Sequence, residues 1–97
     1  MTKKAIIMGA TSGIGRETAI LLMQKGWMVG ACGRRTDKLE ELRHDYPNNI
    51  FTKAIDITQD DAPNKLLSLI DEMGGIDLYL HVSGIGFQNK ALDTEIE

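Results

Sequence analysis

The stretch MGATSGIGRE, residues Met8 to Glu17, holds three glycines, at positions 9, 13 and 15. It follows the apolar run Ala5–Met8, which is typical of a short strand buried on both faces. The residues after the second glycine have helical spacing, so the glycines lie where a strand turns into a helix. A loop in this position indicates a cradle for the phosphates of a nucleotide, with a ligand-free turn as the alternative.

The rest of the sequence alternates between apolar runs and segments with helical periodicity. Each segment between two runs is long enough for a helix, so we expect parallel strands joined by right-handed crossovers. The pattern predicts an α/β fold, a Rossmann-type doubly wound parallel sheet with the strand order 3-2-1-4. The predicted strands are Ala5–Met8, Trp27–Gly33, Ile50–Ile57 and Ile76–Gly84, and the predicted helices are Gly13–Lys25, Thr36–Tyr46 and a third that starts at Thr58–Asp61 and runs to about Met73.

The spacing within two of these helices makes finer predictions. In the first helix, Ile14, Leu21 and Leu22 fall at positions i, i+7 and i+8, which predicts that they lie on its buried face. In the third, Thr58 and Asp61 match the S/T-x-x-D pattern of a helix N-terminus.

The composition is that of a small globular domain. The 97 residues are 42% hydrophobic and 26% charged, have a net charge of −3, and include one cysteine, Cys32. A lone cysteine excludes an internal disulfide and favours a cytoplasmic location, and Cys32 is expected to be a small buried hydrophobe. The apolar runs are far shorter than the ~20 residues that span a bilayer, and the basic charge is too weak for a nucleic-acid surface. We predict one domain over residues 1–97, with neither a membrane nor a nucleic acid as partner.

The three glycines have separate predicted roles. In a doubly wound sheet the ligand lies beyond the carboxyl ends of the strands, where the strand order reverses, here between the first and fourth strands. Gly9 would permit the sharp exit from the strand, Gly13 the close approach of a pyrophosphate, and Gly15 the close packing of helix on sheet. The helix N-terminus would direct its free N–H groups at the phosphates.

The glycine loop and the end of the second predicted strand together distinguish between classes of nucleotide ligand. A phosphate loop of the G-x-x-x-x-G-K-[ST] type is excluded, because Ile14 stands five residues after Gly9 and no lysine follows. A site for NAD or S-adenosylmethionine would usually place an acid here for the ribose hydroxyls. This chain has Arg34 and Arg35 instead, which fit the 2′-phosphate of NADP. The alternative is that both arginines are simply solvated.

Four segments, in order along the chain, resemble the short-chain dehydrogenase/reductase family. GATSGIG is similar to the cofactor loop T-G-x-x-x-G-x-G, with Met8 where threonine is usual. GRRTDKLEEL resembles the segment after the second strand of NADP-preferring members, and AIDIT resembles the element D-[VIL]-[TS]. DLYLHVSGIG resembles D-x-L-V-N-N-A-G-I-G.

The resemblance implies an oxidoreductase that moves hydride between NADP(H) and a carbonyl or alcohol substrate. The acid that meets the adenine ring in the family corresponds to Asp56, with the backbone of Ile57 beside it. No metal site is predicted. The expected cofactor-binding residues are Gly9, Thr11, Ser12, Gly13, Ile14, Gly15, Arg34, Arg35, Asp56, Ile57, Ser83 and Gly84.

One departure from the family lies at the fourth strand. The segment His81–Gly84 reads HVSG where the family has N-N-A-G. Val82 has no amide group to offer, although backbone contacts from this segment remain possible. His81 is expected to be a buried, hydrogen-bonded histidine rather than a catalytic one.

A second departure concerns the catalytic residues. The family's tyrosine lies four residues before a lysine, but Tyr46 is followed at that spacing by Ile50, and Tyr79 by Ser83. Since this tyrosine needs the lysine to act as a general acid or base, no catalytic residue is predicted. The chain is therefore expected to be the N-terminal, cofactor-binding half of a reductase and to be inactive alone.

The alternative function is a stand-alone, non-catalytic dinucleotide-binding module or sensor. In either case the expected small-molecule partner is the dinucleotide. The fourth strand would lack a neighbour on one side, so we expect either self-association through that edge or completion by a C-terminal half.

Overall fold

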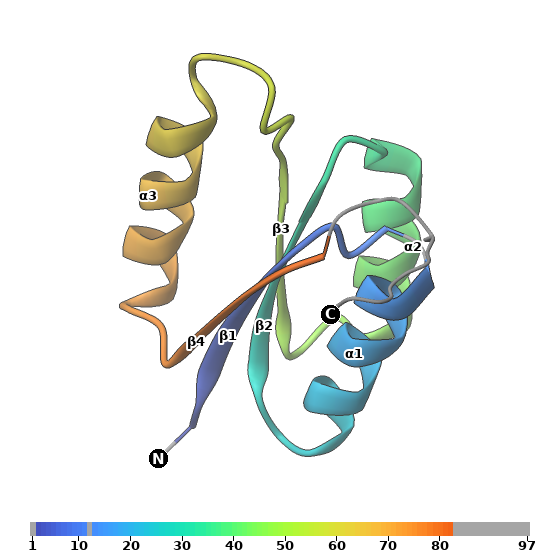
Figure 1. The fold of residues 1–97 in the computed structure, drawn as a ribbon. Coiled ribbons are helices and arrows are strands. Elements are labelled where there is room, and N and C mark those ends of the chain that lie inside the picture. Colours follow the sequence, from blue (N-terminus) through green and yellow to red (C-terminus); the bar gives the residue numbers. More distant parts are fainter. Residues whose placement is uncertain (1, 12, 83–97) are drawn as a thin grey trace, which may run out of the picture.

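A computed structural model describes residues 2–11 and 13–82, which form one four-stranded sheet and three helices (Figure 1). All the strand pairs are parallel, and the order across the sheet is β3-β2-β1-β4. The predicted Rossmann-type fold and its strand order are confirmed. The elements in chain order are β1 (Lys4–Met8), α1 (Gly13–Gln24), β2 (Met28–Gly33), α2 (Thr36–Asp45), β3 (Ile50–Ala54), α3 (Ala62–Met73) and β4 (Leu78–His81).

The helices cover both faces of the sheet, with α1 and α2 on one face and α3 on the other (Figure 1). Successive side chains of a strand point to opposite faces, so β1 contributes to two separate cores. Ile7 packs in the core beneath α1 and α2, whereas Ile6 packs against α3, and both are fully buried. Burial on both faces explains why β1 is a continuous apolar run rather than an alternating one.

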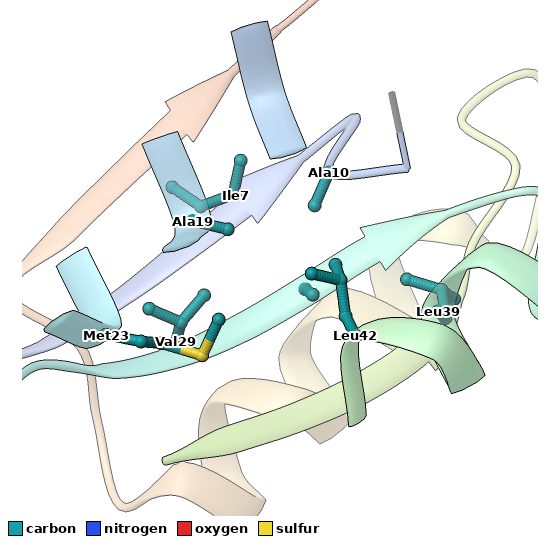
Figure 2. Close-up of a cluster of buried hydrophobic side chains, with 8 residues drawn as sticks. Ile7, Ala10, Ala19, Met23, Val29, Leu39 and Leu42 are labelled. Atoms are coloured by element: carbon teal, nitrogen blue, oxygen red, sulfur yellow. The ribbon is translucent and has the colours of Figure 1, made fainter. Parts of the chain in front are cut away.

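The larger core lies between the sheet and the pair α1 and α2 (Figure 2). The smaller core lies beneath α3 and includes Cys32, which is fully buried as predicted. Small side chains from α1 allow this helix to lie close to the sheet. The residues of the larger core are Ile7, Ala10, Ala19, Met23, Val29, Ala31, Leu39 and Leu42.

The predicted buried face of α1 is wrong for Ile14 and Leu21, whereas Leu22 is partly buried and packs against the larger core. Ile14 is 76% exposed and Leu21 is 52% exposed, and the buried side chains of α1 are instead those of the row Gly15, Ala19 and Met23. These residues are spaced at four, so they form a single ridge along the helix. The first turn of α1 packs against the loop before it so closely that only glycine fits. This contact fixes the rotation of the helix, with Ile14 and Leu21 facing outward.

The start of α3 also differs from the prediction. The helix begins at Ala62, after an N-cap residue, Asp61, whose side chain makes no capping hydrogen bond. Thr58 lies before the helix, where its N–H and Oγ1–H both donate to Asp56 Oδ1, at 2.9 and 2.6 Å. The local turn between these two residues competes successfully with the helix start that the S/T-x-x-D spacing predicts.

Candidate functional site

The carboxyl ends of the four strands meet at one edge of the sheet, where backbone hydrogen bonds hold the loop after β1 from both sides. The N–H groups of Gly9 and Ala10 both donate to the carbonyl oxygen of Cys32 in β2, each at 2.9 Å. On the opposite side, the N–H of Val82 donates to the carbonyl oxygen of Met8 at 2.8 Å. The loop is therefore fixed at the point where the strand order reverses, between β1 and β4.

Two glycines allow three backbone segments to lie in direct contact at this edge. Gly9 has a φ of +95°, and a Cβ there would overlap the carbonyl oxygen of Val82. A Cβ on Gly15, in the first turn of α1, would overlap the carbonyl oxygen of Gly9. The loop thus packs between the end of β4 and the start of α1, as the predicted roles of these two glycines require.

Gly13 stands in a different environment. Its φ is +59°, which favours glycine, but a Cβ built on it would meet no described atom within 4 Å. Contacts with the described residues therefore do not require a glycine here; its positive φ does, and the open space beside the backbone leaves room for a ligand. Gly13 also begins α1, whose first turn carries no acidic side chain and whose first N–H groups have no partner within the helix. Open space beside a positive helix end fits the pyrophosphate of a dinucleotide.

Arg34 and Arg35, at the end of β2, are both exposed but have different partners. Arg35 forms a two-pronged ion pair with Asp37, in which Nε donates to Oδ1 at 3.2 Å and Nη2 to Oδ2 at 3.0 Å. The pair raises the pKa of Arg35 and lowers that of Asp37. Among the described residues, no carboxylate lies within 4 Å of Arg34, although its charge helps to lower the pKa of Asp56.

Asp56 and Ile57 follow β3 at the same edge. Hydrogen bonds from the side chain and backbone of Thr58 are the main cause of the lowered pKa of Asp56, so its carboxyl group is ionised and held in one orientation. Ile57 is 54% exposed and presents an apolar side chain next to this acid. An acid and an apolar surface side by side can receive the polar edge and the flat face of a base.

The prediction that His81 is buried is wrong. The side chain is exposed, and its Nδ1 lies 3.3 Å from the hydroxyl group of Tyr79, two residues earlier on the same strand. Both side chains project from the same face of β4 because they are two residues apart.

The predicted site residues that the structure describes all lie at the carboxyl edge of the sheet or in the loops that leave it. Ser12, Ser83 and Gly84 lie outside the described residues. Two contributors were missed in the sequence. Asp37 could have been noticed from its spacing of two from Arg35, whereas the contact of Val82 with Gly9 has no local signal because 73 positions separate them.

Comparison with known proteins identifies the family. The profile of the short chain dehydrogenase family matches residues 3–97. The chain belongs to the short-chain dehydrogenases. As an oxidoreductase family with a Rossmann-type fold, these proteins bind the nicotinamide dinucleotides NAD or NADP.

Individual short-chain dehydrogenases agree with this assignment. Serine 3-dehydrogenase of Agrobacterium fabrum is 36% identical over 86 residues, which cover 88% of this chain and 34% of that protein. A short-chain dehydrogenase/reductase family oxidoreductase of Aeromonas hydrophila superposes with a TM-score of 0.81 at 26% identity, over 90% of this chain and 42% of that one. A Caenorhabditis elegans family member of unknown function, solved with cofactor, superposes with a TM-score of 0.71 at 33% identity, over 79% and 31% of the two chains.

The chain spans about two-fifths or less of the length of these short-chain dehydrogenases. Within residues 2–11 and 13–82, no helix is long and apolar enough to cross a membrane. The same residues contain no group of three or more His, Cys, Asp or Glu side chains that could hold a metal ion.

Proposed function

We propose that residues 1–97 form the NADP(H)-binding part of a short-chain dehydrogenase that transfers hydride between the cofactor and a carbonyl or alcohol. The observation that carries this proposal is the environment of Gly13, which has a positive φ and no described atom within 4 Å of the place where a Cβ would lie. That space adjoins the N-terminus of α1 at the reversal of strand order. Free N–H groups at the N-terminus of a helix bind phosphate groups, so this position fits a pyrophosphate.

The proposed cofactor residues divide by the part of the dinucleotide they would meet. Gly9, Gly13 and Gly15 shape the phosphate loop, and Asp56 and Ile57 hold the adenine. The arginines after β2 carry positive charge, and no acid stands between the end of β2 and Asp37. Both features favour the 2′-phosphate of NADP over the free hydroxyl of NAD. The remaining proposed contacts are Thr11, Ser12, Ile14, Ser83 and Gly84.

The bound nicotinamide ring would supply the hydride chemistry, whereas this part of the chain would bind and orient the cofactor. A tyrosine four residues before a lysine is absent from the sequence, so we propose that residues 1–97 by themselves show no turnover. The acid–base groups would come from a C-terminal half, which would also cover β4. Cytoplasmic location remains a prediction from the sequence.

Calorimetric titration of the protein as expressed from its gene tests the proposal. NADPH should bind more tightly than NADH, and Arg34→Asp should abolish or reverse the preference, because a carboxylate repels the 2′-phosphate and can bind a ribose hydroxyl instead. Equal affinity for both cofactors would contradict the NADP assignment, and failure to bind either would contradict the function. Tight binding without turnover on any carbonyl or alcohol would favour the non-catalytic module.

A further inference from the structure

We infer that Lys53 closes the β3 edge of the sheet to the addition of another strand, so that β4 is the open edge of the described sheet. In the order β3-β2-β1-β4, β3 and β4 are the two outer strands, and each pairs with one described neighbour. Outer strands offer unpaired backbone N–H and C=O groups to other chains. The two edges differ in the side chains that lie beside those groups.

Backbone hydrogen bonds identify the groups of β3 that face outward. The carbonyl oxygen of Asn49 accepts the N–H of Val29 at 2.9 Å. At the other end of the strand, the N–H of Ile55 donates to the carbonyl oxygen of Gly33, also at 2.9 Å. Because successive residues of a strand direct these groups to alternate sides, the odd-numbered residues of β3 bond to β2. The N–H and C=O groups of Thr52, midway along β3, therefore point to the free edge.

The side chain of Lys53 points inward, toward α3, although β3 is an outer strand. Lys53 stands opposite Cys32 of β2 in the parallel register, and Cys32 is fully buried in the smaller core. Only 24% of the lysine side chain is exposed. The side chains of a strand laid along β3 would cover this remaining part, and burying an ammonium group away from water is costly.

Two side chains of α3 hold the ammonium group in this place. Lys53 Nζ donates to Glu72 Oε2 at 3.1 Å and to Ser68 Oγ at 3.3 Å. Ser68 lies four residues before Glu72 on the helix, and its hydroxyl group donates to the same carboxylate oxygen at 3.4 Å. Because both partners belong to α3, the lysine does not extend past the edge, where its charge could stay in water while a strand paired.

The β4 edge has no comparable charge. Its residues, Leu78–His81, include no Lys, Arg, Asp or Glu, and Tyr79 is 41% exposed. A charged side chain that points inward from an edge strand is one of the means by which proteins prevent pairing with other chains. The described sheet therefore has a closed edge at β3 and an open one at β4.

Removal of the charge from β3 tests the inference. In the 97-residue chain carrying Tyr79→Lys, which places a charge on β4, Lys53→Val should strengthen self-association about tenfold or more, because valine favours strands and has no charge to bury. Size-exclusion chromatography with light scattering over a range of concentrations measures this change. Thr52→Val is the matched control: it adds an apolar β-branched side chain to the same strand but keeps the lysine, so association should not change.

A proline on β3 shows whether the new contact uses this edge. Thr52→Pro removes an N–H that faces outward and leaves the hydrogen bonds to β2 intact, so it should abolish the association gained with Lys53→Val. Lys53→Met, which removes the charge but keeps a long side chain, is the second variant, and circular dichroism checks that each chain is folded. A folded Lys53→Val or Lys53→Met chain that associates no more strongly than its parent would overturn the inference. The same holds for a gain that Thr52→Pro leaves unchanged or that Thr52→Val produces equally.

Discussion

Gly15 in the first turn of α1 packs directly on the backbone carbonyl of Gly9, with no space between them for a Cβ. Gly15→Ala should therefore lower the free energy of unfolding by about 2–3 kcal/mol or more, because a backbone carbonyl cannot move aside as a flexible side chain can. Urea unfolding followed by circular dichroism measures the loss. A fall of less than about 1 kcal/mol would show that the helix can lift away from the loop.

Gly13→Ala should separate cofactor binding from stability. The positive φ of Gly13 makes alanine cost about 1 kcal/mol, but no described atom within 4 Å would be displaced. The added methyl group would occupy the space proposed for the pyrophosphate, so NADPH binding should weaken at least tenfold. Isothermal titration calorimetry measures this change.

Gly26 offers a matched control for that variant. It has a φ of +90°, and a Cβ there would likewise meet no described atom within 4 Å, but it lies in the turn between α1 and β2, at the amino end of the strand. Gly26→Ala should cost a similar free energy of unfolding and leave NADPH affinity unchanged. If the two variants weaken binding equally, the space beside Gly13 is not a phosphate site.

Cys32 should make stability depend on pH in the alkaline range. Burial raises the pKa of its thiol to about 12, although the charge of Lys53 opposes this shift. Because the folded-state pKa lies above the unfolded value of about 8.5, the stabilisation is complete below that value and is lost as the pH rises toward 12. The free energy of unfolding should fall by up to about 1.4 kcal/mol per pH unit in this window. Cys32→Ala should remove this part of the slope in urea unfolding at pH 8 and pH 10, and an unchanged slope would contradict the assignment.

The edge of β4 should drive self-association of the 97-residue chain. Among the described strands, β4 pairs only with β1, and Tyr79 on it is 41% exposed. Tyr79→Lys should shift the chain toward monomer in size-exclusion chromatography with light scattering, because a charge on an edge strand opposes pairing. Leu67→Lys on α3 is the control, since it also replaces an exposed apolar side chain. A monomer at high concentration before any substitution would contradict the prediction.

A lysine at position 80 would test the edge of β4 less clearly than Tyr79→Lys. The side chain of Leu80 is partly buried and packs against the larger core, so Leu80→Lys would unfold the strand as well as block its edge. Only the observed direction of each side chain on β4 distinguishes these two neighbouring positions.

Local patterns in the sequence were sufficient to predict the strand order and the place of the glycine loop. Apolar runs indicate where the strands lie along the chain, although not their exact ends, and the long connections between them require parallel pairing with crossovers. The position of the loop follows, because a parallel sheet brings all its carboxyl ends to one edge. These features depend on residues close together in the chain.

Contacts between distant residues could be decided only in three dimensions. Spacing predicts which residues share a helical face, but not which face meets the sheet, and the contact of Gly15 with Gly9 turned the exposed side chain of Ile14 outward. His81 is exposed and lies beside the hydroxyl group of Tyr79, which the residues next to it in the sequence do not indicate. Sequence determines which groups are available to a site, whereas packing against distant backbone decides which of them face it.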